Sequence, residues 1–155
     1  MAACSTGVPD ESMDVHDKET RSFNMSRIRG KDTKPEMIVR RACHALGLRF
    51  RLHRKDLPGK PDLVFAKHRT VVFVHGCFWH SHDCRYGRVV PKTNAGFWRE
   101  KRAATVERDR EKARQLEALG WRVLEYWECE TRAKVVEALP DRIAKDFKLY
   151  PEYRA

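Results

Sequence analysis

The sequence predicts an α/β fold in which a mixed β-sheet is flanked by helices. Three observations lead to this prediction. The expected elements follow in the order helix, strands, helix, strand and helix. Residues 71–74 (Val-Val-Phe-Val) are wholly apolar, as in a central strand buried on both faces. A long charged segment, residues 95–119, has apolar residues at helical spacing and precedes Gly120. The length of 155 residues fits one ordinary domain.

The N-terminal third is expected to contain a tail, a basic segment and a helix. Residues 1–17 lack an apolar period and are expected to be disordered, so that a single domain spans residues 18–150. Basic residues gather between Lys18 and Lys34. A helix should begin near Thr33, since Thr33 can serve as N-cap, proline follows early, and Glu36 stands at the capping-box position. Gly47 should end it. The expected inward face comprises Ile38, Ala42, Ala45 and Leu46.

The strands and the remaining helices follow from the patterning of the rest of the chain. Residues 48–52 alternate apolar and basic side chains and predict a half-buried strand, and residues 62–65 predict a second one after the turn at 57–61. An irregular loop is expected over 75–94, a strand over 121–127, and a helix over 135–147 with a break at Pro140. The expected inward residues of the 95–119 helix are Val106, Ala113, Leu116 and Leu119.

The charge balance points to a polyanionic partner. The chain has 32 Lys and Arg residues against 22 Asp and Glu residues, a net charge of +10, and nucleic acid is the commonest polyanion for such a surface. An anionic membrane is the competing interpretation, but no basic amphipathic helix with an aromatic apolar side stands out, and no apolar run is long enough to span a bilayer. The N-terminus lacks the apolar core of a secretory signal, and the five cysteines fit a reducing compartment. We therefore expect a cytoplasmic protein without a membrane partner.

Four residues predict a structural zinc site. Cys77, His82 and Cys84 lie close together, and Cys129 follows a strand that could lie beside the one before Cys77. Three cysteines and one histidine form a common tetrahedral zinc set, and a metal can hold a loop that has little apolar area of its own. His75 and His80 compete as the histidine ligand. The alternative is that the cysteines are small buried residues and the histidines are merely solvated.

Catalytic candidates both precede and follow the expected central strand in the sequence. Asp62 follows Pro61 at the start of a strand and could hold a hard cation, although an aspartate at such a position often caps a turn. Glu36 has a similar alternative as the capping-box partner of Thr33. His75 and His80 are candidate general bases because imidazole titrates near neutral pH.

Several longer motifs resemble those of a known family. Residues 58–62 (PGKPD), 73–80 (FVHGCFWH) and 127–129 (WEC) closely resemble the Vsr endonucleases of very short patch repair, as do 21–25 (RSFNM) and 106–109 (VERD). The resemblance covers about residues 15–129. It implies a restriction-endonuclease-like fold, a structural zinc, and Mg²⁺-dependent nicking of double-stranded DNA 5′ to the T of a T:G mismatch left by 5-methylcytosine deamination. The family acts as a monomer, and a MutL-like repair protein is a candidate for a further partner.

The resemblance also assigns roles to individual residues. Asp62 would bind the catalytic Mg²⁺ together with the backbone carbonyl of Val74, and His80 would activate water. His75 and Glu36 would support them, and Cys77, His82, Cys84 and Cys129 would bind zinc.

The family further implies that aromatic side chains enter the DNA base stack. Phe78, Trp79 and Trp98 would intercalate from one groove, and Met25 and Ile28 from the other. Trp98 and Phe78 have a simpler alternative as core residues. Arg21, Arg27 and Thr105 are expected to contact DNA, and Thr105 stands where the family often has Asn, which puts the sequence preference in doubt.

Two rival functions fit the composition. A zinc-stabilised module that binds distorted duplex DNA without cutting it would share the charge, the zinc and the aromatic residues. A generic restriction endonuclease would cut matched DNA on both strands. Asp62, His80 and the family resemblance favour mismatch nicking.

Overall fold

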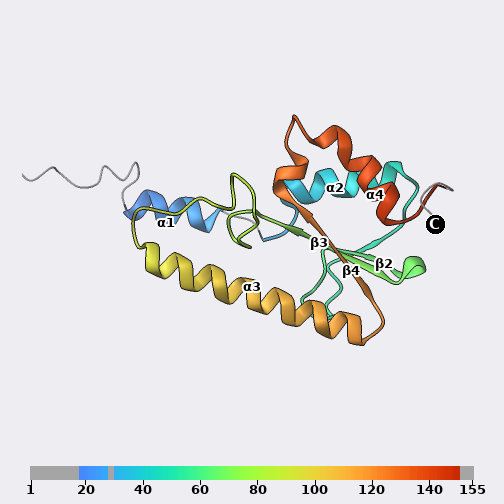
Figure 1. Ribbon diagram of the computed structural model, residues 1–155, viewed down its shortest axis with the longest axis horizontal. Helices are drawn as coiled ribbons and strands as arrows, with labels where there is room; N and C mark the ends of the chain where they lie inside the picture. The colour runs from blue at the N-terminus through green and yellow to red at the C-terminus, as the bar shows by residue number, and fades with distance from the viewer. Residues whose placement is uncertain (1–17, 28–29, 151–155) are drawn as a thin grey trace, which may run out of the picture. The chain divides into compact units, whose positions relative to one another are not determined.

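A computed structural model describes residues 18–27 and 30–150 (Figure 1). The chain divides into two compact units, residues 1–31 and 32–155. The first contains helix α1 (Lys18–Ser26), which the sequence pattern did not predict. The expected tail, residues 1–17, and the predicted intercalating residue Ile28 lie outside the described residues. No helix in the described ranges is long and apolar enough to cross a bilayer.

The second unit is built on a four-stranded mixed sheet, as the sequence predicted. The strands are β1 (Arg51–Leu52), β2 (Leu63–Phe65), β3 (Thr70–His75) and β4 (Arg122–Trp127), and they lie side by side in this order. The β1–β2 and β2–β3 pairs are antiparallel, whereas β3 and β4 are parallel. The apolar strand β3 is therefore interior to the sheet. Its last residue, His75, pairs with Trp127 at the end of β4.

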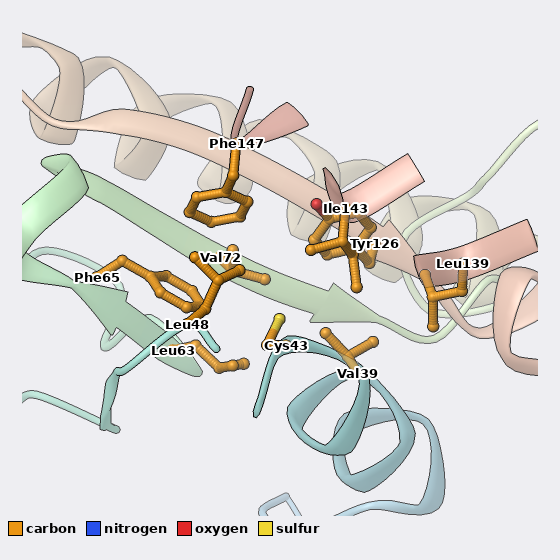
Figure 2. Packing of buried hydrophobic residues seen from close by; sticks show 10 residues of the cluster. All are labelled: Val39, Cys43, Leu48, Leu63, Phe65, Val72, Tyr126, Leu139, Ile143 and Phe147. Atoms are coloured by element: carbon orange, nitrogen blue, oxygen red, sulfur yellow. The ribbon is translucent and has the colours of Figure 1, made fainter. Parts of the chain in front are cut away.

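Helices cover both faces of this sheet (Figure 1). Helices α2 (Lys34–Ala45) and α4 (Leu139–Asp146) lie on one face, and α3 (Ala95–Ala118) lies on the other. Figure 2 shows the core under α2 and α4, formed by Val39, Cys43, Leu48, Leu63, Phe65, Val72, Tyr126, Leu139, Ile143 and Phe147. The core on the α3 side contains Leu57, Val64, Val71, Phe73, Leu116 and Trp121. Successive strand residues alternate between the two cores, as the pleat requires.

Helix α2 begins as predicted but is rotated relative to the expected face. Thr33 is the N-cap and accepts a hydrogen bond of 3.4 Å from the N–H of Glu36. Gly47 follows the helix with φ +79°, a conformation that glycine adopts without strain. The buried apolar residues are Val39 and Cys43, whereas Ile38, Ala42 and Leu46 are half-buried and Ala45 is exposed. The rotation places the polar residues Glu36 and Arg40 in the interior.

Three other predictions were wrong in detail. A strand was expected over residues 48–52, but β1 contains only Arg51 and Leu52. Leu48 and Phe50 precede the strand and pack against the core from there. Leu119 is 54% exposed, because α3 ends at Ala118 and Trp121 fills the core beyond the turn at Gly120. Pro140 does not break a helix: it stands in the first turn of α4, where its missing N–H costs nothing, and a short 3₁₀ helix (Val136–Ala138) precedes it.

Candidate active site and metal-ligand clusters

The parallel pairing of β3 and β4 brings the predicted zinc ligands together. Cys77 and Cys129 each stand two residues beyond the paired His75 and Trp127, so the two chain segments leave the sheet side by side. The loop after β3 then returns His82 and Cys84 to the same place. The four ligand atoms lie within 4.8 Å of one another. Three thiols and one imidazole at this spacing are the donor set of a structural zinc site.

Hydrogen bonds and one glycine fix the shape of this cluster. The N–H of Cys129 donates to Cys77 Sγ at 3.3 Å, and His82 Nδ1 lies 3.6 Å from Cys129 Sγ. The N–H of Gly87 donates to Cys84 Sγ at 3.4 Å. A Cβ at Gly87 would lie 1.9 Å from the carbonyl oxygen of His82, so only glycine fits where the loop crosses itself.

Asp62 lies at the start of β2 and reaches across to β3. Its Oδ2 accepts a hydrogen bond of 2.8 Å from the N–H of Val74, rather than capping its own turn. Burial raises the pKa of Asp62 above its usual range, the Val74 N–H opposes the shift, and the Glu36 carboxylate adds to it. A bound cation would offset both unfavourable effects on the ionised form.

A histidine that sequence reasoning missed connects Asp62 to Glu36. His53 Nε2 lies 3.0 Å from Glu36 Oε1, and His53 Nδ1 lies 3.8 Å from Asp62 Oδ1. The Glu36 side chain also forms a salt bridge with Arg40 and is only 3% exposed. Its carboxylate thus faces the site, while only its backbone N–H takes part in the Thr33 cap.

His75 and His80 form the other half of the site. Their rings lie 4.0 Å apart between centroids. His75 Nε2 lies 3.4 Å from Glu125 Oε1, and this hydrogen bond lowers the pKa of Glu125. Both histidines lie outside the cluster of three cysteines and His82, in a separate donor group with Asp109.

Asp109 holds His80 in one orientation. Asp109 Oδ2 lies 2.5 Å from His80 Nδ1, and because a carboxylate accepts, the proton of the neutral ring resides on Nδ1. Burial lowers the pKa of His80, His75 adds to that shift, and Asp109 opposes it. Nε2 of the neutral ring is then left with a lone pair that can take a proton from water. The role of Asp109, noticed in the sequence only as part of a motif, arises from the packing of α3 against this loop.

The three predicted aromatic residues form one surface cluster. Phe78, Trp79 and Trp98 are half-buried, and neither core cluster of the described residues contains them. Their ring centroids lie 5.2 to 5.7 Å apart. Lys101 Nζ lies 5.4 Å from the Trp98 ring centroid, and the Arg102 guanidinium lies 4.7 Å from that of Phe78. Trp98 and Phe78 are thus not members of either core, and their entry into the DNA base stack stays a prediction.

Comparison with known proteins identifies the family. A family model described as DNA mismatch endonuclease Vsr matches residues 13–86. The DNA mismatch endonuclease Vsr of Escherichia coli is 47% identical over 133 residues, covering 84% of this chain and 85% of that protein. The chain belongs to the Vsr family of DNA mismatch endonucleases. The type II nicking enzyme V.XorIIP of Xanthomonas oryzae is 52% identical over 112 residues, 72% of this chain and 82% of that enzyme. The type II nicking enzyme V.NmeAIP of Neisseria meningitidis is 44% identical over 123 residues, which cover 79% of this chain and 87% of that enzyme.

The remaining predicted DNA contacts of this Vsr-family chain are described only in part. Arg27 is exposed, and its guanidinium lies 4.5 Å from the Phe23 ring centroid. Arg21 and Met25 belong to α1, but the structure does not describe their side chains. Thr105 Oγ1 donates to the carbonyl of Lys101 at 3.0 Å and accepts from Arg108 at 3.1 Å.

The combined change Phe78→Ala and Trp79→Ala is expected to reduce the preference for T:G over matched duplex by on the order of 10²-fold, since base–aromatic stacking is worth ~1–3 kcal/mol per base. Non-specific affinity should change far less, because it rests on phosphate contacts. Competition binding with T:G and T:A duplexes measures the ratio. Zinc content serves as the control, because both residues lie between Cys77 and His82. An unchanged ratio in the folded, zinc-loaded variant would show that these rings take no part in discrimination.

Proposed function

We propose that this Vsr-family endonuclease nicks double-stranded DNA 5′ to the T of a T:G mismatch in a Mg²⁺-dependent reaction. The cut would initiate very short patch repair where 5-methylcytosine has been deaminated. The observation that carries this proposal is the His80–Asp109 pair of 2.5 Å, with the His75 ring 4.0 Å from that of His80 and near enough to the half-buried Asp62 carboxylate to lower its pKa. A base, a cation-binding carboxylate and an aromatic surface cluster are what hydrolysis at a distorted base pair requires.

The donors at Asp62 fit Mg²⁺. Mg²⁺ prefers oxygen ligands and keeps several of its waters, so one carboxylate and one carbonyl suffice when DNA phosphate adds to them. In an extended strand the N–H and C=O of one residue point to the same side. Because the N–H of Val74 points to Asp62, its carbonyl is directed to that side too. Bound there, Mg²⁺ would neutralise charge that develops on the phosphate.

Proton transfer, orientation of the catalytic groups and zinc binding would be carried out by different residues of the chain. His80 Nε2 would take a proton from the attacking water, with Asp109 fixing the ring through Nδ1. His75 packs against the His80 ring and would help to hold it in place, while Glu125 would favour the imidazolium that forms on His80. Glu36 would orient Asp62 through His53, which lies between the two carboxylates. The Cys77, His82, Cys84 and Cys129 cluster would hold zinc and fix the loop that carries the aromatic rings.

The wider setting of the protein is part of the same proposal. We assign the fold to the restriction-endonuclease-like class, on the four-stranded mixed sheet that has helices on both faces and Asp62 at the start of β2. The enzyme would act as a monomer on chromosomal DNA in the bacterial cytoplasm, with a MutL-like protein as a further partner. Residues 18–150 would form its single functional domain.

A nicking assay on end-labelled duplexes tests the function. A single cut 5′ to the mismatched T is expected with Mg²⁺, and none with EDTA or on a T:A duplex. Cuts on both strands of matched DNA would indicate a generic restriction endonuclease. Tight binding of the T:G duplex without any cut would indicate a zinc-stabilised binding module.

Binding should weaken steeply with salt. The net charge of +10 provides Lys and Arg for phosphate contacts, and each contact releases counterions. The affinity for duplex DNA should fall on the order of 10²-fold or more between about 50 and about 200 mM salt. Fluorescence anisotropy over this range measures it, and T:G and T:A duplexes should give the same slope because their phosphates are the same. An affinity independent of salt would contradict an electrostatic interface.

A further inference from the structure

One arginine of helix α3 connects that helix to the loop after β3. Arg102 Nη1 donates to the carbonyl of Val89 at 3.0 Å, and Nη2 donates to the carbonyl of Gly87. Its guanidinium also covers the Phe78 ring, with 4.7 Å between the guanidinium carbon and the ring centroid. A single side chain thus contacts the loop at three residues, one of which belongs to the aromatic surface cluster.

The guanidinium of Arg102 is directed into the protein. Both terminal nitrogens donate to carbonyl oxygens of the loop, and Nε is buried without a hydrogen-bond partner among the described residues. A guanidinium is planar and carries five N–H donors, so it can lie flat on a ring and bind two carbonyls at the same time. These contacts are those of a side chain that holds the loop, whereas an arginine that binds phosphate presents its donors to solvent.

One of the two carbonyls belongs to a crowded point of the loop. The N–H of Gly87 donates to Cys84 Sγ at 3.4 Å, and a Cβ at Gly87 would lie 1.9 Å from the carbonyl oxygen of His82. Gly87 is therefore held on one side by two members of the cysteine and histidine cluster and on the other side by Arg102. Because the loop has no room to shift here, the guanidinium is fixed where it contacts the Phe78 ring.

Helix α3 holds the same loop at a second point. Asp109, which pairs with His80, stands seven residues after Arg102, so the two side chains lie two turns apart on one face of the helix. Trp98, four residues before Arg102, belongs to this face as well and packs against Phe78, with 5.7 Å between the ring centroids. One face of α3 thus holds the His80 ring and the Phe78 ring by separate contacts.

We propose that Arg102 is a positioning residue for mismatch recognition, which holds the Phe78 ring, and with it the aromatic surface cluster, ready to enter the base stack. The inference rests on the proposed function, in which this cluster distinguishes T:G from matched pairs. Phe78 meets Trp79 and Trp98 edge to face, so its orientation affects how both indoles are presented. A ring that is ordered before binding loses less conformational entropy when DNA binds. Arg102 supplies this order through a cation–π contact and two hydrogen bonds.

A double-mutant cycle on the ratio of affinities for T:G and T:A duplexes tests the inference. Arg102→Met removes the charge and the donors but keeps an unbranched side chain, and it should lower the ratio about tenfold. In the Phe78→Ala background the same change should alter the ratio less than about twofold, because Arg102 acts through the ring that is then missing. Arg99→Met removes the same charge from an exposed position three residues earlier and should leave the ratio unchanged.

Tryptophan fluorescence of the DNA-free protein reports on the cluster itself. Phe78 lies against Trp79 and Trp98, so a displaced Phe78 ring should leave these indoles more accessible. Acrylamide should therefore quench Arg102→Met more strongly than Arg99→Met. The other two of the four tryptophans are present in both variants and cancel in the comparison.

Two results would overturn the inference. One is a folded, zinc-loaded Arg102→Met variant with the wild-type ratio, and the other is a loss that persists undiminished in the Phe78→Ala background. If Arg102→Met does not retain zinc, Arg102→Lys replaces it in the cycle. Lysine keeps the charge but has no planar fork, so the ratio should still fall about threefold, and only where Phe78 is present. A wild-type ratio in that variant would exclude the role. Equal affinity of the wild type for T:G and T:A would instead refute the proposed function, while the quenching comparison would still decide this inference.

Discussion

The change Asp62→Asn is expected to lower the rate of T:G nicking by on the order of 10³-fold or more, which corresponds to the several kcal/mol that a catalytic cation contributes. Asparagine keeps an oxygen that can accept the 2.8 Å hydrogen bond from the Val74 N–H, so the connection between β2 and β3 should persist. It loses the negative charge that would bind Mg²⁺. Single-turnover nicking at saturating enzyme isolates this loss from any change in binding.

The affinity of Asp62→Asn for the T:G duplex should be equal to or slightly above that of the wild type, because one negative charge facing phosphate is removed. Asp56→Asn is the matched control: it removes an equal charge from an exposed turn, where Asp56 forms a salt bridge with Arg54. That variant should nick at the wild-type rate. Wild-type nicking by Asp62→Asn under Mg²⁺ would show that Asp62 acts only as a structural link between strands.

The sequence predicted those parts of the molecule that depend on local interactions. Helix α2 begins where a cap, a proline and an acidic residue follow one another, and the four central residues of β3, 71–74, are all apolar. The grouping of Cys77, His82, Cys84 and Cys129 in space was predictable because residue sets that can bind zinc have few alternatives in type and spacing.

Residues whose role arises from tertiary packing could not be predicted in this way. His53 has no sequence motif and becomes part of the site only because the chain before β2 passes α2. Asp109 meets His80 across 29 positions of sequence. The burial of Arg40 contradicts the usual exposure of arginine and depends on the two carboxylates beside it. Such contacts decide which residues surround the site. A family motif therefore predicts the residues that carry the chemistry, but not the charged neighbours that shift their pKa values.

Cys129→Ala is expected to remove zinc and to unfold the second unit, or to lower its melting temperature by tens of degrees. A structural zinc site contributes an apparent ~10–16 kcal/mol of folding free energy, comparable with the whole stability of a domain. The destabilisation should extend to the paired ends of β3 and β4, because Cys77 and Cys129 connect the two segments that follow these strands.

A buried cysteine outside the cluster provides the control for that experiment. Cys43 is fully buried in the core under α2, where burial raises the pKa of its thiol to about 12, and it is not a member of the ligand group. Cys43→Ala removes one buried sulfur and should cost about 1 kcal/mol, with one zinc per chain retained. Metal analysis and thermal unfolding of both variants distinguish loss of a ligand from loss of packing. Wild-type protein without stoichiometric zinc, or a Cys129→Ala variant as stable as Cys43→Ala, would refute a structural zinc. The loop from Cys77 to Cys84 would then have to be held by hydrogen bonds alone, such as that from the Gly87 N–H to Cys84 Sγ.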